Sequence, residues 1–453
     1  MKRARKYKWL IFISAYIILL AFLAIFDEPL NPEVKSFVNV YHDRVPAEEN
    51  VYYAILGFNA PPGTDIHAKG IEIVQSFEEA LRKNPSLAEF DKRKLFEGPE
   101  LPFTGQLPEF YKDRGFSCLK YAKTSKKDIE KLLADNRELL DRYYSLYRYP
   151  RFHETVTIVM SAPLLHYVPV RNAHKLMLFR LSNDANAGRM SAVLDSLSQD
   201  IRYWRRILKE SNDIISKIVA VLTIKTDYLF LSELISSGKI DSAHMQIPES
   251  LMGPLTADEV NMSGTMRREF QITMDETRRI KNSLLQKHRG EKKDAGWKFL
   301  MWPFFKVNAS INILYPSRKK LVEAAAMPAW DLVQESKKWE EQKKTKMGLD
   351  FFYNSAGAII HKPIGALENL KYLSYLTKVH DLDGLTRLVS LQFTAKKHAI
   401  AYTNMDAFLK KADARYSNPY TGDPMKWDAG KKCLYFESLS KENEKPKRIE
   451  LFL

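Results

Sequence analysis

Two groups of histidine and aspartate residues could bind a metal ion or activate a water molecule. The first group comprises His42, Asp43, Asp65 and His67. Asp65 and His67 stand at the end of the turn-forming stretch NAPPGTD, residues 59–65. Brought together, two imidazoles and two carboxylates could hold Zn²⁺ or activate water. Both local sequences, HDR and DIH, are also common on protein surfaces, so the sequence leaves open whether the four side chains meet.

The second group is the segment HDLDG, which contains His380, Asp381 and Asp383. An Asp-x-Asp pair beside a histidine can bind a divalent cation through its carboxylate oxygens. We expect this segment to lie between two helices, where an aspartate also caps the N-terminus of the following helix. Helix capping is the favoured interpretation, and cation binding is the alternative.

No familiar catalytic motif is present in the sequence. It contains no GxSxG elbow, P-loop, HExxH, CxxC pair or GxGxxG before a helix. The remaining histidines near the middle of the chain stand alone and suggest no site; they are His153, His166, His174 and His361. The sequence therefore predicts no catalytic residue and no cofactor, and it favours a binding protein over an enzyme.

The two cysteines, Cys118 and Cys433, allow one disulfide bond. In an oxidising compartment such a bond would tie the N-terminal region to the C-terminal end of the chain. Two free, buried thiols are the favoured alternative, because a chain of 453 residues can bury enough apolar surface without a covalent link.

The segment 9–26, WLIFISAYIILLAFLAIF, is an uncharged apolar run. As a helix its 18 residues would extend roughly 27 Å, about the thickness of the hydrocarbon core of a bilayer. Residues 1–8 contain five basic side chains and no acid, which predicts a cytoplasmic N-terminus and places the bulk of the chain across the membrane. The alternative is a cleaved signal peptide, whose apolar core is usually shorter, roughly 7–15 residues.

The formal net charge is +15, and ten of these charges lie beyond the anchor. This excess favours an anionic surface or an acidic partner in addition to the lipid bilayer. Nucleic acid is not an expected partner, because basic and acidic residues alternate along the predicted helices.

Apolar residues recur at helical spacing through most of the chain, with short breaks between the segments. This pattern predicts a mainly α fold: a transmembrane helix, an antiparallel helical array resembling a solenoid, and a small C-terminal β-hairpin. In the hairpin, MKWDAGKKCLYFES, we expect Trp427 to be largely buried, and the final RIELFL could add a third strand. The predicted regions are a basic tail (1–8), the anchor (9–26), a mixed loop-rich region (27–124), a helical domain (125–296), a second helical region (297–404) and the C-terminal module (405–453).

Several stretches resemble uncharacterised single-pass, membrane-anchored proteins of Gram-negative bacteria: YYAILGFNAPPGTDIHAKG, FSCLKY, NAGRMSAVLDSLSQDIRYWRRILKES and NPYTGDPMKWDAGKKCLYFES. No activity is assigned to that set, so the resemblance implies an inner-membrane location with a periplasmic body, and no chemistry. Its members tend to carry a further cysteine shortly before the position of Cys118, which this chain lacks.

NPYTGDP also resembles a turn near the end of bacterial envelope proteins, including pseudopilin-like ones. Asn418 and Asp423 replace Asp and Lys there, which weakens any cation site.

The expected function is therefore an interaction or scaffold module of the bacterial envelope. One alternative is an envelope hydrolase with its site near residues 59–67 or 380–384, and another is a lipid-binding helical domain. A polar cleft where acids and histidines converge would favour the hydrolase. A long apolar groove would favour the lipid binder, and a broad concave face the scaffold.

Overall fold

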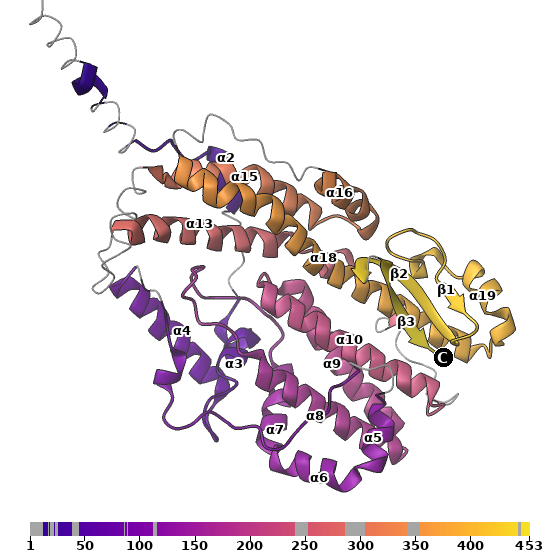
Figure 1. Ribbon diagram of the computed structural model, residues 1–453. Coiled ribbons are helices and arrows are strands. Elements are labelled where there is room, and N and C mark those ends of the chain that lie inside the picture. Colours follow the sequence, from indigo (N-terminus) through magenta and orange to yellow (C-terminus); the bar gives the residue numbers. More distant parts are fainter. Residues whose placement is uncertain are drawn as a thin grey trace, which may run out of the picture.

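The chain is mainly helical and ends in a small antiparallel sheet, as the computed structural model shows (Figure 1). The structure describes residues 12–16, 18, 22, 26–38, 45–85, 87, 89–111, 116–240, 252–285, 304–341, 354–442 and 445–453. The helices of the first half are α2 (Pro32–Val38), α3 (Val51–Leu56), α4 (Ile66–Lys83), α5 (Cys118–Thr124), α6 (Lys126–Asp135), α7 (Arg137–Ser145), α8 (Tyr167–Asn186), α9 (Met190–Glu210) and α10 (Ile214–Ser236). Those of the second half are α12 (Ala257–Val260), α13 (Ser263–Leu285), α15 (Val307–Ala324), α16 (Ala329–Glu341), α18 (Ser355–Lys397) and α19 (Met405–Lys411).

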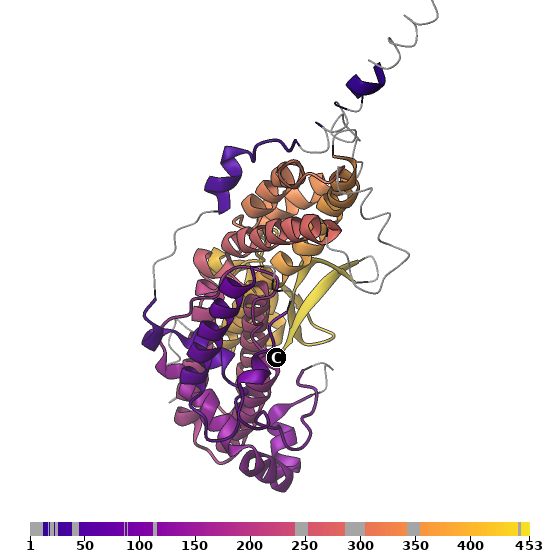
Figure 2. The same cartoon turned by 90° about the vertical axis from the view of Figure 1, so that its left-hand side faces the viewer.

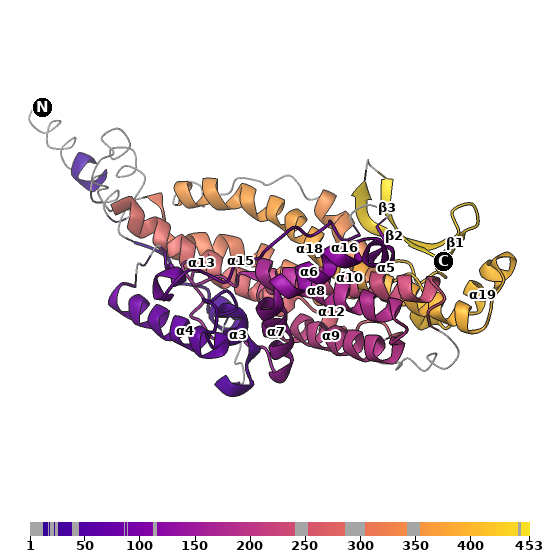
Figure 3. The same cartoon turned by 90° about the horizontal axis from the view of Figure 1, so that it is seen from below.

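The body is elongated and has two layers of helices (Figures 1 and 3). In the first layer, consecutive helices α8, α9 and α10 pack against each other, and α5 and α7 pack on α8. In the second layer, α15 packs against both α13 and α18. The layers meet mainly where α10 packs along α18. One continuous apolar core runs from Val51 to Leu451 across both layers, so the body behaves as one packed unit.

Helix α2 joins the N-terminal segment to the second layer (Figure 2). Val34 of α2 is fully buried against Phe270 of α13 and Ile311 of α15 in a second, smaller apolar cluster. Asp27 accepts hydrogen bonds from the backbone N–H groups of Asn308 and Ala309 at the start of α15. The chain that follows the predicted anchor is therefore fixed to the body within about one helical turn of its end.

Most of the predicted anchor, residues 9–26, lies outside the described residues. The described stretch 12–16 is helical and lies apart from the body, with Phe12 and Tyr16 exposed (Figures 1 and 2). Within the described part of the chain, no helix is both long enough and apolar enough to span a membrane. The transmembrane helix therefore stays a prediction.

The segment HDLDG does not lie between two helices, and its interpretation as a helix cap is wrong. It belongs to the interior of α18, which continues without a break from Ser355 to Lys397. Gly384, which suggests a helix end in the sequence, instead permits a close contact: a Cβ atom there would lie 2.3 Å from the ring of Phe436 in the sheet. The glycine therefore serves sheet-on-helix packing.

The C-terminal strands confirm the predicted hairpin and the third strand. Strand β1 (Lys426–Asp428) pairs with β2 (Cys433–Glu442), which pairs with β3 (Lys445–Phe452), all antiparallel. The prediction that Trp427 is largely buried is confirmed in part. Its side chain packs against the apolar core and beside Tyr402, and its Nε1 is shielded from solvent, but the residue keeps some exposure.

Both cysteines are buried and free. Cys118 begins α5 in the first layer, and Cys433 begins β2 in the C-terminal sheet. The NPYTGDP turn is held without a cation: the side-chain oxygen of Asn418 accepts the N–H of Tyr420, and its backbone N–H donates to the carbonyl of Asp423. An asparagine in this role closes the turn through its own amide.

Candidate functional site

Two of the four residues predicted to bind a metal have structural roles. Asp65 caps α4 by accepting the N–H groups of His67 and Ala68. The ring of His67 stacks on Tyr149 at 4.6 Å between centroids, and its Nε2 lies 2.9 Å from the carbonyl of Ala47. His42 and Asp43 lie outside the described residues, so the four-residue site stays a prediction.

The turn that precedes α4 is fixed by a buried arginine. Arg142 of α7 donates hydrogen bonds of 2.7–2.8 Å to the carbonyls of Phe58, Ala60 and Pro61. Glu138, one turn earlier on α7, accepts from Arg142 at 2.7 Å and from the backbone N–H of Gly63 at 2.9 Å. The loop near residues 59–67 is therefore pinned to α7 by hydrogen bonds to the carbonyls of Ala60 and Pro61 and to the N–H of Gly63.

A cluster of ionisable side chains lies in the core of the first layer, at the contact of α8, α9 and α10. His174, Asp200 and Asp227 come from these three helices in turn, and none is more than 3 % exposed. Nε2 of His174 lies 2.7 Å from Oδ1 of Asp227 and 3.4 Å from Oδ2 of Asp200. Each of the three residues offers one atom that could bind a metal ion, and these three atoms all lie within 4.8 Å of one another. We call these three residues the His174 cluster.

The His174 cluster is electrostatically unusual for an apolar core. Burial acts to lower the pKa of His174, but the neighbouring carboxylates of Asp227 and Asp200 outweigh it and raise that pKa to about 9. Burial, with the adjacent Asp200, raises the pKa of Asp227 well above its ordinary value. The cluster therefore takes up positive charge readily, in the form of protons or of a cation.

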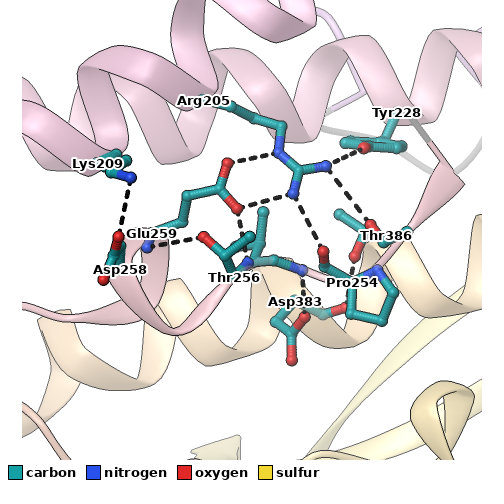
Figure 4. A network of polar contacts seen from close by, with 11 residues as sticks. Arg205, Lys209, Tyr228, Pro254, Thr256, Asp258, Glu259, Asp383 and Thr386 are labelled. Atoms are coloured by element: carbon teal, nitrogen blue, oxygen red, sulfur yellow. Dashed lines mark hydrogen bonds and ion pairs between the residues drawn. The ribbon is translucent and has the colours of Figure 1, made fainter. Parts of the chain in front are cut away.

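A second buried network joins the two layers (Figure 4). Arg205 of α9 forms a bidentate ion pair with Glu259 of α12, with both nitrogen–oxygen distances 2.7 Å. Glu259 also completes a capping box with Thr256. Asp383 of α18 accepts the N–H of Leu255 at 2.8 Å. Burial acts to raise the pKa of Glu259, but its hydrogen bonds from Arg205 outweigh that effect and lower it.

A polar cleft of about 350 Å³ opens between the layers on one side of α12. We call it the inter-layer cleft. Its lining includes the basic residues Lys209, Lys217, Arg267 and Arg268 and the acidic residues Glu154 and Asp258. Val38, at the end of α2, forms part of its wall and accepts a hydrogen bond from Gln271. The cleft is therefore linked to the N-terminal segment.

The acidic groups of the inter-layer cleft already have partners. Oε1 of Glu154 accepts hydrogen bonds from Ser211, Asn212 and Asp213, and Asp258 pairs with Lys209 at 2.8 Å. Arg267 lies over the ring of Phe37, and Nε of the half-buried Arg268 has no hydrogen-bond partner. Neither arginine lies within ion-pair distance of a carboxylate of the described residues, and Asp213 and Glu269 are more distant electrostatic neighbours of Arg268. The unsatisfied charge in this cleft is therefore positive.

A second cleft, of about 460 Å³, opens on the other side of α12 and is lined by His380, Asp383, Arg387 and Asn418. Both carboxylate oxygens of Asp383 are engaged, one by Leu255 and the other by Arg387 at 2.6 Å. A third cleft, of about 450 Å³, lies where α10 and α18 meet the end of β3. His380 and Asp383 of HDLDG therefore do reach a cleft, but both carboxylate oxygens of Asp383 already accept hydrogen bonds from the protein.

We expect His380 to make the protein sensitive to acid. Burial, reinforced by Arg387, lowers the pKa of His380 from 6.5 to about 4. Between these values the unfolded chain binds a proton that the folded chain does not, so stability falls as the pH drops from 6.5 to 4, by at most about 3 kcal/mol. Urea unfolding of the full chain in detergent, at several pH values, measures this slope. His380→Gln should flatten it, and the exposed His398→Gln should not. Parallel slopes for all three proteins would contradict the prediction.

The His174 cluster was missed in the sequence because its members stand on three different helices, each among apolar residues. The only signal is that a histidine and two aspartates occupy core-facing positions of consecutive amphipathic segments.

Comparison of the chain with protein-family models, with curated proteins and with solved structures finds no match.

Proposed function

We propose that this chain is a single-pass inner-membrane protein of a Gram-negative envelope whose periplasmic helical body binds an anionic group of a partner. The observation that carries the proposal is the pair Arg267 and Arg268, which line the inter-layer cleft without a close ion pair to a carboxylate of the described residues. Guanidinium groups so placed favour carboxylate or phosphate ligands. The successive packing of α8, α9 and α10 supports a solenoid-like scaffold around the cleft.

The membrane part of the proposal rests on the apolar run 9–26 and the basic residues before it. The exposure of Phe12, Ile18 and Phe22 supports it, because contact of large apolar side chains with water is unfavourable and contact with lipid would relieve that cost. The hydrogen bonds of Asp27 to α15 would hold the body close to the bilayer, with α2 between the anchor and the cleft.

The topology predicts that alkaline phosphatase fused after Leu453 is active in a Gram-negative host, because the enzyme folds only in the periplasm. A fusion of GFP at the same point should be dark. An inactive phosphatase fusion with a fluorescent GFP fusion would reverse the orientation. A soluble mature chain that begins near Asp27 would show that the apolar segment is a cleaved signal peptide.

We expect multivalent anions to stabilise the full chain in detergent through the cleft arginines. Pyrophosphate and a poly-glutamate peptide serve as probes, and the measurement is the thermal midpoint as a function of probe concentration. Replacing both Arg267 and Arg268 by Gln should reduce the apparent affinity by on the order of tenfold or more, since each lost charge-assisted hydrogen bond is worth about 1.5–3 kcal/mol.

The matched control is Arg278→Gln, an exposed arginine on the same helix. This substitution changes the net charge without changing the cleft. The affinity of the Arg278→Gln variant for both probes should therefore stay near that of the parent chain. Equal losses in the two proteins would show that the probes bind the basic surface in general, and no stabilisation by either probe would remove the proposed anion site.

The two alternative functions, a hydrolase and a lipid-binding domain, have weaker support. A hydrolase at residues 380–384 would have to free Asp383 from Arg387 and Leu255 before the carboxylate could act. A lipid binder would use the apolar cleft near Ile235 and Leu453, whose volume of about 450 Å³ suits only part of an acyl chain pair.

A further inference from the structure

We propose that the His174 cluster binds one Zn²⁺ ion, with Nε2 of His174 and one carboxylate oxygen each of Asp200 and Asp227 as ligands. These atoms already lie within 4.8 Å of each other. Ligands on a tetrahedral zinc at 2.0–2.1 Å are about 3.3 Å apart. The separation of 3.4 Å between Nε2 of His174 and Oδ2 of Asp200 matches that value. Oδ1 of Asp227 now lies 2.7 Å from Nε2, so this carboxylate would have to shift to present its free Oδ2 to the ion.

The inner oxygens of both aspartates are available for the ion. Oδ2 of Asp200 and Oδ2 of Asp227 are fully buried and have no hydrogen-bond partner in the structure. Buried oxygens of this kind are costly unless something satisfies them. One imidazole N–H can donate a good hydrogen bond to only one of the two carboxylates. A cation that contacts both would therefore stabilise the buried carboxylates more than the histidine does alone.

The residues around the cluster form the outer shell that a metal site needs. Tyr143 and Tyr147 each donate a hydrogen bond of 2.6 Å to Oδ1 of Asp200, the oxygen other than the free one. Trp204 donates to the hydroxyl of Tyr143 at 2.8 Å and so fixes its orientation. Ligating carboxylates are typically held in this way, by donors on the oxygen turned away from the metal.

The charge balance also favours a divalent ion. Two carboxylates and a neutral imidazole carry two negative charges, which a divalent cation neutralises in an apolar core. No lysine or arginine of the described residues pairs with either carboxylate. A mixed nitrogen and oxygen ligand set of this size suits Zn²⁺ better than Mg²⁺ or Ca²⁺, which take oxygen ligands in larger number.

The ion would have a structural role. None of the three clefts described above is lined by a member of the His174 cluster, so no substrate reaches it from them. The three ligands instead come from α8, α9 and α10, and an ion between them would tie the helices of the first layer together. Binding would then be coupled to folding, as in other structural zinc sites.

The test is the metal content of the full chain, purified in detergent after removal of any affinity tag from cells grown with added zinc. We expect about one Zn²⁺ per chain by plasma mass spectrometry, and a visible absorption of four-coordinate Co²⁺ when cobalt replaces zinc in the medium. Asp227→Asn should lose the metal. Tyr147→Phe should retain it with an affinity about 10–100 times lower, in competition with a chromogenic chelator.

The control is His398→Gln, an exposed histidine outside the cluster, which should keep the parent metal content. Should Asp227→Asn fail to fold, the cobalt spectrum of the parent chain decides alone. Parent protein without zinc and without a cobalt spectrum would overturn the proposal, and the cluster would then share a proton between its carboxyl groups. Equal metal loss in His398→Gln would show adventitious surface binding and overturn it equally.

Discussion

Glu259→Gln should lower the free energy of unfolding by about 3–5 kcal/mol, because it removes the bidentate carboxylate that balances the charge of the largely buried Arg205. Both side chains are only about a tenth exposed, and the two nitrogen–oxygen distances of 2.7 Å define a bidentate pair. The pair ties α9 in the first layer to α12 (Figure 4). Residues of α12 line both the inter-layer cleft and the second cleft. Equilibrium unfolding in urea, with the full chain in detergent, measures the change.

The neighbouring Asp258→Asn is the control for this prediction. Asp258 pairs with Lys209 at 2.8 Å, but both side chains are more than half exposed, so the change should cost less than about 1 kcal/mol. The double variant Arg205→Met with Glu259→Met should recover much of the lost stability, since no unpaired charge then remains buried. A loss for Glu259→Gln no larger than that for Asp258→Asn would mean that water reaches Arg205 and that the network does not join the layers.

The features that the sequence predicted well depend on local patterns. The C-terminal sheet followed from period-two alternation on both sides of a turn, which neighbouring residues alone determine. The helical character of the chain followed from apolar spacing in the same way. The burial of Trp427 followed only in part: it packs against the core, but alternation along a strand does not say how much of a side chain stays in contact with solvent.

The features that it missed depend on distant contacts. Gly384 indicated a helix end, but its small size is required by Phe436, which packs on α18 from the sheet. The His174 cluster exists only because three separate helices bring one polar residue each to the same point in the core. Spacing along the chain carries no information on that convergence. For Asp65 and His67, whose meeting with His42 and Asp43 the sequence left open, the structure shows helix capping and ring stacking.

Arg142→Met should lower the free energy of unfolding by about 4 kcal/mol. The change removes the Arg142 donors from the carbonyls of Phe58, Ala60 and Pro61, of which Pro61 keeps the N–H of Thr64. An unsatisfied buried carbonyl costs about 1–3 kcal/mol. Some of that cost is recovered if the loop moves to reach water. The free energy of unfolding of Arg142→Lys should lie between those of the parent chain and Arg142→Met, because one ammonium group cannot donate the several hydrogen bonds of a guanidinium. Urea unfolding of the three proteins gives the order.

The control is Arg137→Met on the same helix, whose side chain is 85 % exposed and whose substitution should change stability by less than about 0.5 kcal/mol. Hydrogen exchange locates the effect: in Arg142→Met the amides between Gly57 and Asp65 should exchange faster, while those of α9 keep their protection. Protection of the loop equal to that of the parent chain would show that other contacts hold it. The three hydrogen bonds of Arg142 would then contribute little, because water would replace them without loss.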